Sequence, residues 1–184
     1  RVMAKIIATP SLAGQVDTQR IAAAGHSLGG WTVLELAGAR FDAERFQTDC
    51  RTHKVLSACK LSPTLGIDNA ATQLAGDGRE PKIRAVVSLD LGLARGFTPE
   101  SLSQIAVPVL IMSAQVDSDA LPAKLESGYL AAYIPASVRR DQSVEGATHF
   151  SFMQQCKPGA GALIAEKDPG DEIVCQDGGT LSRA

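Results

Sequence analysis

This sequence of 184 residues has few aromatic residues and no block of like charges. Aromatic residues make up 4% of it, and 18 Lys and Arg against 20 Asp and Glu leave a net charge of −2. Nucleic-acid-binding proteins gather basic residues on one face, so we expect no nucleic-acid partner. The sequence also lacks a run of about 18 apolar residues, so we expect no membrane span.

Metal-binding motifs are missing as well. There is no Cys-x-x-Cys, and the three histidines, His26, His53 and His149, do not have the spacing of metal ligands. We therefore expect neither a metal nor another cofactor.

Four cysteines stand in polar, glycine-rich segments, and an even number suits two disulfides. The simplest pairing is Cys50–Cys59 with Cys156–Cys175, although four cysteines allow three pairings. Because disulfides persist in oxidising compartments, this pairing predicts a periplasmic or secreted protein. The alternative is a cytoplasmic enzyme with four reduced thiols.

The most informative stretch, residues 25–30, reads Gly-His-Ser-Leu-Gly-Gly. It stands between a short apolar run, Ile21–Ala24, and a helical pattern from Leu28 to about Arg40. A Gly-x-Ser-x-Gly motif between a strand and a helix is typical of a sharp turn that exposes a nucleophilic serine, here Ser27. The alternative is a glycine-rich turn whose serine merely faces solvent.

The residues around Ser27 have predicted roles of their own. Gly25 and Gly29 are expected to be needed because a Cβ at either position would collide with the neighbouring strand and helix. The helix that follows offers free backbone N–H groups, beginning with Leu28, to an oxyanion that develops during the reaction.

Further strands and helices are expected to alternate after this turn, and this pattern indicates a parallel sheet with helices on both faces. The apolar runs Ile83–Leu89 and Val107–Ser113 are typical of strands covered on both sides, and a weaker strand pattern spans about Ser137 to Val144. Helical patterns span about Pro99–Gln104, with Thr98 as N-cap, and about Leu121–Tyr133.

The loops that follow the strands of such a sheet form its ligand-binding edge. These loops contain Ser27, Asp90, Asp117 and His149, which are a nucleophile, two acids and a base. The segment at about 41–82 instead follows a helix, so we expect it to be an excursion that starts at the opposite edge, is pinned by a disulfide and lies outside the chemical site.

A serine hydroxyl needs a base within hydrogen-bond reach, and histidine suits this role. His149 follows the last predicted strand in a loop that begins with a glycine, and is the candidate base. His26 is expected to face away from its neighbour Ser27, and His53 falls in the excursion. The alternative for His149 is a histidine in an ordinary surface loop.

The acid of the predicted triad is left open between two main candidates. Asp117, which follows the strand at 107–113, is preferred, and Asp90, which follows the strand at 83–89, is the alternative. Asp119 is a third choice. Either main candidate would orient the imidazole and stabilise its cation, and the other would be a structural carboxylate that caps a loop.

Three segments carry a resemblance to a known family: Val16–Gly30, Ala85–Asp90 with Val107–Ile111, and Ala147–Phe152 with Cys156 and Cys175. They resemble bacterial dienelactone-hydrolase-like proteins related to platelet-activating-factor acetylhydrolase. The resemblance implies one α/β-hydrolase domain over residues 1–184. It also implies a serine esterase, often exported, that hydrolyses small or short-acyl esters through a Ser-His-Asp triad and an acyl-enzyme. The acid resembles Asp90 in the acetylhydrolase branch and Asp117 in most α/β-hydrolases.

The resemblance also implies several strands before the serine turn, and one of their loops would supply a second oxyanion N–H beside that of Leu28. Only 20 residues precede the strand at Ile21, and they begin at Arg1 in a helical pattern. The chain is therefore expected to be the C-terminal portion of a longer hydrolase, with one unpaired edge on its first strand. Alternatives are a non-catalytic α/β-hydrolase-like binding module, or the same chemistry in a lipase, peptidase or polyester hydrolase.

Overall fold

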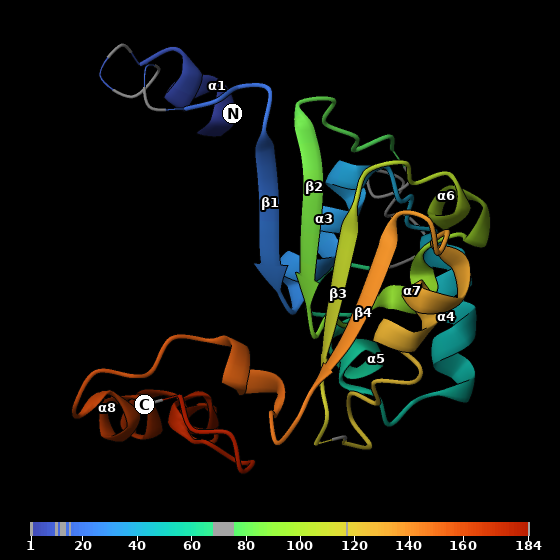
Figure 1. Cartoon of the computed structure of the whole chain (residues 1–184). Coiled ribbons are helices and arrows are strands. Elements are labelled where there is room, and N and C mark those ends of the chain that lie inside the picture. The colour runs from blue at the N-terminus through green and yellow to red at the C-terminus, as the bar shows by residue number, and fades with distance from the viewer. Residues whose placement is uncertain are drawn as a thin grey trace.

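The computed structural model describes residues 2–9, 11, 14, 16–67, 76–116 and 118–183. Strands and helices alternate along the chain (Figure 1). The strands are β1 (Ile21–His26), β2 (Ile83–Leu89), β3 (Val109–Ala114) and β4 (Arg139–Val144). The α-helices are α1 (Val2–Ile7), α3 (Leu28–Ala37), α4 (Ala43–Thr52), α5 (Ser57–Leu61), α6 (Pro99–Ser103), α7 (Ser127–Tyr133) and α8 (Ala160–Lys167), and the 3-10 helices are η2 (Ala94–Gly96), η3 (His149–Phe152) and η4 (Asp171–Cys175).

The four strands form one parallel sheet in the order β1-β2-β3-β4. This confirms a mixed α/β fold with a parallel sheet. The third strand starts at Val109 rather than at the expected Val107. Pro108 has no N–H to donate to a neighbouring strand, so regular pairing begins one residue later.

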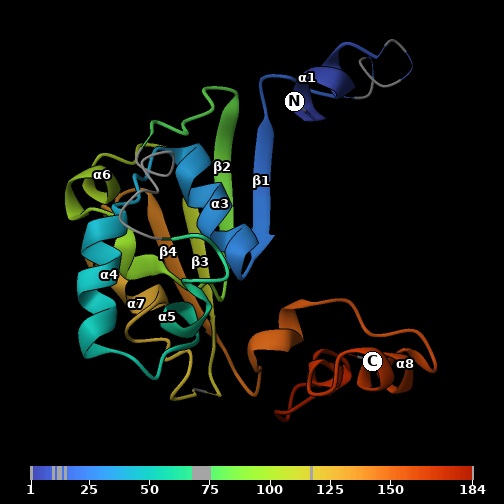
Figure 2. The same ribbon diagram turned by 180° about the vertical axis from the view of Figure 1, so that it is seen from behind.

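Helices cover one face of this sheet. The side chains of Val86, Val109 and Ile111 are buried on that face, where Figures 1 and 2 show α3, α4, α6 and α7. On the opposite face Val87 and Leu110 are only half-buried, and none of the described helices covers them. The expectation of helices on both faces is therefore not met in the described part of the chain.

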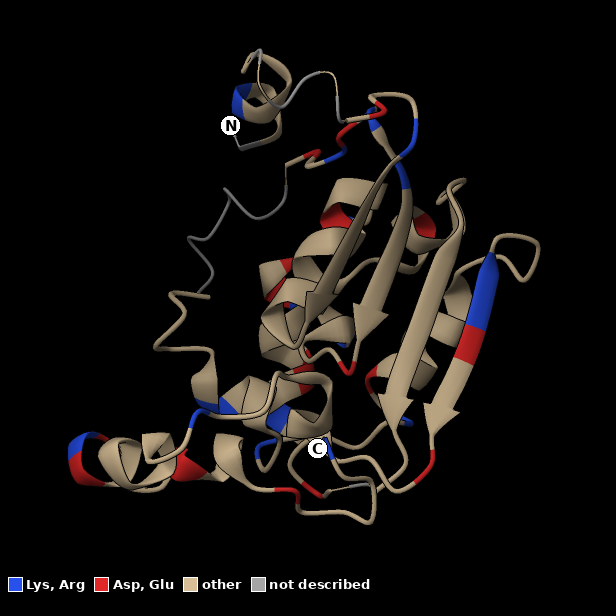
Figure 3. Ribbon diagram, turned by 60° about the vertical axis from the view of Figure 1, so that its left-hand side comes forward, with Lys and Arg blue, Asp and Glu red and all other residues tan. Residues whose placement is uncertain are grey.

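The two edges of the sheet differ in charge (Figure 3). β4 starts with Arg139, Arg140 and Asp141, and charged side chains on an edge strand discourage pairing with another chain. β1 has no Lys, Arg, Asp or Glu. Among the described residues β1 pairs only with β2, so its outer edge lacks a partner there, as the sequence predicts.

An aromatic cluster fixes the loop after β2 against the start of α4. Phe41 and Phe97 pair in an isolated antiparallel bridge, and their rings meet edge to face with centroids 5.9 Å apart. The ring of Trp31 from α3 stacks on Phe97 at 5.6 Å. Gly96 has to be glycine here because a Cβ would overlap the Phe41 ring. The loop that carries Asp90 is thus anchored in the core.

Local sequence explains where three helices begin or end. Thr98 caps α6 by accepting a hydrogen bond from the Ser101 N–H at 3.3 Å, as predicted. α3 ends at Ala37, before the expected Arg40, because Gly38 takes a left-handed conformation with φ of 110°. α7 is shorter than expected and begins at Ser127, because residues 123–126 form turns.

Two disulfides fasten segments outside the sheet. Cys50–Cys59 ties α4 to α5, and Cys156–Cys175 closes the C-terminal segment that contains α8 and η4. Both predicted pairings are confirmed. The C-terminal segment lies below the carboxyl ends of the strands in Figure 1. Within the described residues, no helix has the length and hydropathy needed to cross a bilayer.

Candidate active site

Ser27 occupies a strained turn between β1 and α3. Its backbone has φ of 56° and ψ of −119°, a conformation that non-glycine residues rarely adopt. Its N–H donates to the Leu89 carbonyl at 3.0 Å, and its own carbonyl accepts from the Trp31 N–H at 3.2 Å. Strain of this kind persists where the surroundings hold it, and it is common at functional sites.

Of the two glycines that the sequence predicts to be required at this turn, only Gly25 leaves no room for a Cβ. A Cβ at Gly25 would overlap the carbonyl of Gly29, as the sequence predicts, whereas a Cβ at Gly29 would have no atom within 4 Å. The expectation for Gly29 was therefore wrong, because its backbone, rather than its missing side chain, forms the close contact. Gly30 also requires glycine, since a Cβ there would lie 2.9 Å from the Ser88 Oγ.

Asp90 lies at the carboxyl end of β2, and its carboxylate is bound at both oxygens. Oδ1 accepts the Ala114 N–H at 2.8 Å, and Oδ2 lies 2.7 Å from Nδ1 of His149. The side chain is only 7% exposed. A carboxylate can only accept, so the proton of this hydrogen bond sits on Nδ1 of His149. That leaves the lone pair on Nε2 of a neutral imidazole, which is the form that a general base needs.

His149 begins the 3-10 turn η3, which is braced at its start. The Thr148 side chain accepts a hydrogen bond from the Ser151 N–H, and the Thr148 N–H donates to the Ser151 Oγ at 3.0 Å. This reciprocal capping box fixes the backbone on either side of the imidazole. Before it, Gly146 turns the chain with φ of 68°, and its N–H donates to Oε1 of Gln115 at 3.0 Å.

Ser27 and His149 line one cavity of about 510 Å³. Its other walls are mainly apolar and include Leu61, Phe150 and Ile173, and none of the described residues that line it is Lys, Arg, Asp or Glu. Such a cavity suits an uncharged apolar group, because a charged one would lose its hydration without gaining a partner.

The segment at 41–82 reaches this cavity, contrary to expectation. Ser57, Ala58 and Leu61 of α5 line it, and the Ser57 N–H donates to the Ala120 carbonyl at 2.7 Å. α4 and α5 carry the chain from the opposite edge of the sheet back to the functional edge, so this excursion forms a wall of the site.

His26, which the sequence predicts to face away from Ser27, contacts His149. Its Nε2 lies 2.8 Å from the His149 carbonyl oxygen, and the two imidazole rings lie 4.4 Å apart at their centroids. Burial, and then the proximity of His149, hold the pKa of His26 below its usual range. The one available signal is its position at the carboxyl end of β1, where loops of a parallel sheet converge.

The structure also places other residues that the sequence analysis considered for the site. Leu28 is the first residue of α3, so its N–H has no acceptor one turn earlier within the helix. Asp117 lies outside the described residues. Asp119 is exposed in a turn. His53 caps the end of α4, where its Nδ1 lies 3.2 Å from the Asp49 carbonyl oxygen.

One group of potential metal ligands occurs among the described residues: Asp49, Cys50 and Cys59. Both cysteines of this group are joined in a disulfide, and a disulfide has no thiolate to offer a metal. The group therefore does not fit a metal ion.

Comparison with known proteins adds no family to this description. No protein-family model matches the sequence, and a search of curated proteins found no match.

Proposed function

We propose that this protein is a serine carboxylic-ester hydrolase whose triad is Ser27, His149 and Asp90. One observation carries the proposal: Asp90 Oδ2 lies 2.7 Å from His149 Nδ1, while His149 and the strained Ser27 line the same cavity. A nucleophile, a base and an acid that orients the base are the parts such a site needs. Asp90 takes the place of Asp117 as the proposed acid because of this contact.

In the proposed reaction His149 Nε2 removes the hydroxyl proton as Ser27 Oγ attacks the ester carbonyl. The Leu28 N–H, at the start of α3, donates to the oxyanion. His149 then gives its proton to the leaving alcohol, which leaves an acyl-enzyme on Ser27. A water molecule, deprotonated by His149, hydrolyses this acyl-enzyme. Asp90 stays ionised and stabilises the imidazolium that forms in each half of the reaction.

The lining of the cavity favours an uncharged substrate, and we propose small or short-acyl esters as the substrates. Its apolar walls favour an aliphatic or aromatic group on the ester. The two disulfides support a periplasmic or secreted location for the protein. We propose that the parallel sheet, with Ser27 on the turn after β1, belongs to an α/β-hydrolase fold.

A fluorophosphonate probe, which phosphonylates an activated serine, tests the proposal. We expect covalent labelling at Ser27, located by peptide mapping, together with hydrolysis of p-nitrophenyl acetate. Ser27→Ala should abolish the labelling and lower turnover by several orders of magnitude. Ser57→Ala is the matched control, because Ser57 lines the same cavity but has no proposed part in the chemistry. An unlabelled wild-type protein would favour the non-catalytic binding module instead.

A further inference from the structure

Two histidines that are 123 residues apart in the sequence meet beside Ser27. His26 ends β1 and immediately precedes the nucleophile, whereas His149 begins η3. The contact has two parts, a hydrogen bond from a side chain to a backbone carbonyl and a ring-to-ring packing contact.

The hydrogen bond fixes the protonation of His26. A backbone carbonyl can only accept, so Nε2 of His26 must carry the proton that it donates to the His149 oxygen at 2.8 Å. Nδ1 of the neutral ring is then unprotonated. The bond holds the peptide carbonyl of His149, and it is distinct from the bond between Asp90 and the imidazole.

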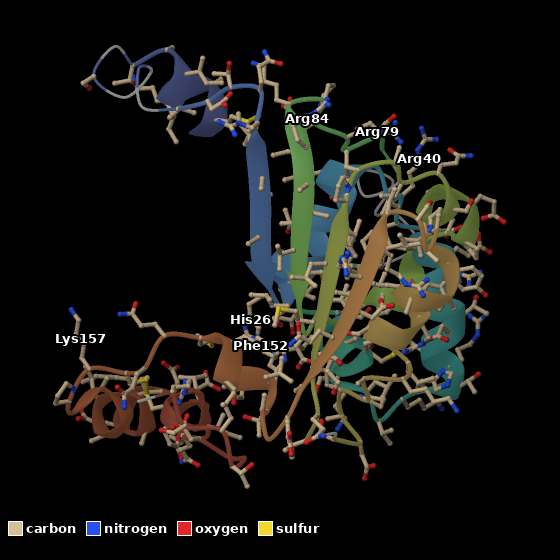
Figure 4. The ribbon with its side chains drawn as sticks, viewed as in Figure 1. His26, Arg40, Arg79, Arg84, Phe152 and Lys157 are labelled. Carbon is tan, nitrogen blue, oxygen red and sulfur yellow. A yellow bond between two sulfur atoms is a disulfide. The ribbon has the colours of Figure 1, made fainter. Side chains whose placement is uncertain are left out.

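Ring packing spans both ends of the η3 turn. The His26 ring lies 4.4 Å from the His149 ring and 6.2 Å from the Phe152 ring, centroid to centroid. His26 and Phe152 lie side by side below the end of β1 in Figure 4. The imidazole of His26 thus braces the first and last residues of the turn that presents the base.

These contacts complete the constraints on the base. Asp90 holds Nδ1 of the imidazole, and the Thr148–Ser151 capping box holds the backbone of the turn. Asp90 connects this turn to Ser27 only indirectly, through the carbonyl of its neighbour Leu89, which accepts the Ser27 N–H. His26 makes that link directly, because it is covalently joined to Ser27 and bonded to the His149 carbonyl.

We propose that His26 is a positioning residue that sets the distance between Ser27 and His149 by tying the η3 turn to the end of β1. This role rests on the proposed function. His26 itself exchanges no proton with the substrate. A displacement of the base by about 1 Å lowers turnover by roughly a hundredfold in enzymes, so loss of the tie should reduce kcat far more than substrate binding.

The test compares two variants of the full chain, His26→Phe and His26→Gln. Phenylalanine keeps a ring against His149 and Phe152 but has no donor, while glutamine keeps a side-chain N–H of similar reach. We expect kcat for p-nitrophenyl acetate to fall by ten- to a hundredfold in His26→Phe with KM within about threefold. His26→Gln should restore most of that loss. His53→Phe, the same change outside the site, should leave kcat unaltered.

The outcomes separate this role from the proposed function. Suppose first that the wild-type protein hydrolyses the ester, so that the esterase proposal stands. The positioning role is then overturned if His26→Phe has the wild-type kcat, or if kcat of His26→Gln is no higher than that of His26→Phe. If His26→Phe is unfolded by circular dichroism, His26→Ala and His26→Gln are compared for the rate of fluorophosphonate labelling at Ser27, and equal rates overturn the role. If the wild-type protein is neither active nor labelled, the proposed function fails, and the role of His26 fails with it.

Discussion

Asp90 and His149 are 59 residues apart in the sequence, yet Oδ2 of the carboxylate lies 2.7 Å from Nδ1 of the imidazole. The other oxygen of Asp90 accepts the N–H of Ala114, the last residue of β3. The neighbouring strand therefore aims the carboxylate at the base, and this geometry underlies the first prediction.

We predict that Asp90→Asn lowers kcat for ester hydrolysis by about ten-thousandfold. The asparagine oxygen can still accept from Ala114, so its amide NH₂ would face Nδ1 of His149. This arrangement moves the imidazole proton to Nε2 and removes the base. Asp117→Asn is the comparison, measured with the same substrate at the same pH. A larger loss in Asp117→Asn than in Asp90→Asn would return the acid to Asp117.

The glycines of the serine turn provide a matched pair. Gly25→Ala should reduce the free energy of unfolding by about 3 kcal/mol or more, because the new Cβ overlaps the Gly29 carbonyl. Gly29→Ala should leave it unchanged or slightly higher, because its Cβ enters open space on the first turn of α3. Urea denaturation of both variants measures the difference. Equal losses would contradict this account of the turn.

The Cys156–Cys175 disulfide is expected to stabilise the fold and to support the cavity. It joins cysteines 19 positions apart, and a loop of this length contributes about 3 kcal/mol by restricting the unfolded chain. The double variant Cys156→Ser/Cys175→Ser should lose about that much free energy of unfolding in urea. Its KM for the ester should also rise, because Ile173 of the closed segment lines the cavity.

Peptide mapping without reduction is the control for this experiment. It should recover both linked peptide pairs from the wild-type protein and only Cys50–Cys59 from the variant. Four alkylatable thiols in protein purified from its native compartment would refute the disulfide assignment.

Glu35 should make stability depend on pH. Partial burial on α3 raises the pKa of Glu35 from 4.5 to about 7. The folded protein then holds this proton more tightly than the unfolded chain, so the contribution to stability is complete below pH 4.5 and is lost as the pH rises through about 7.

We therefore predict that Glu35→Gln is more stable than the wild-type protein at pH 8, by about 1 kcal/mol once solvent screening of the partly exposed side chain is allowed for. At pH 4 the two proteins should be equally stable. Glu166→Gln, the same change at an exposed position on α8, is the control variant. Urea denaturation at both pH values gives the comparison.

Local patterns in the sequence were sufficient for much of this fold. The apolar run at 83–89 predicts β2 at its observed bounds, and Thr98 followed by Pro99 predicts the start of α6. Cysteines only 9 and 19 positions apart predict both disulfides. Each of these signals depends on neighbours along the chain, so hydrophobic period, capping chemistry and spacing are enough to find it.

Which residues come together at the candidate site was decided by the tertiary structure. Asp90 and Asp117 have the same sequence signal, an acid after a buried strand. Only the pairing of β2 with β3 directs the Asp90 carboxylate to both Ala114 and His149. His26 also depends on tertiary structure, because the fold brings the carboxyl end of β1 to the η3 turn. The same is true of α5, whose Ser57 N–H reaches the Ala120 carbonyl. Such contacts join residues far apart in the chain, and no local pattern encodes their distance.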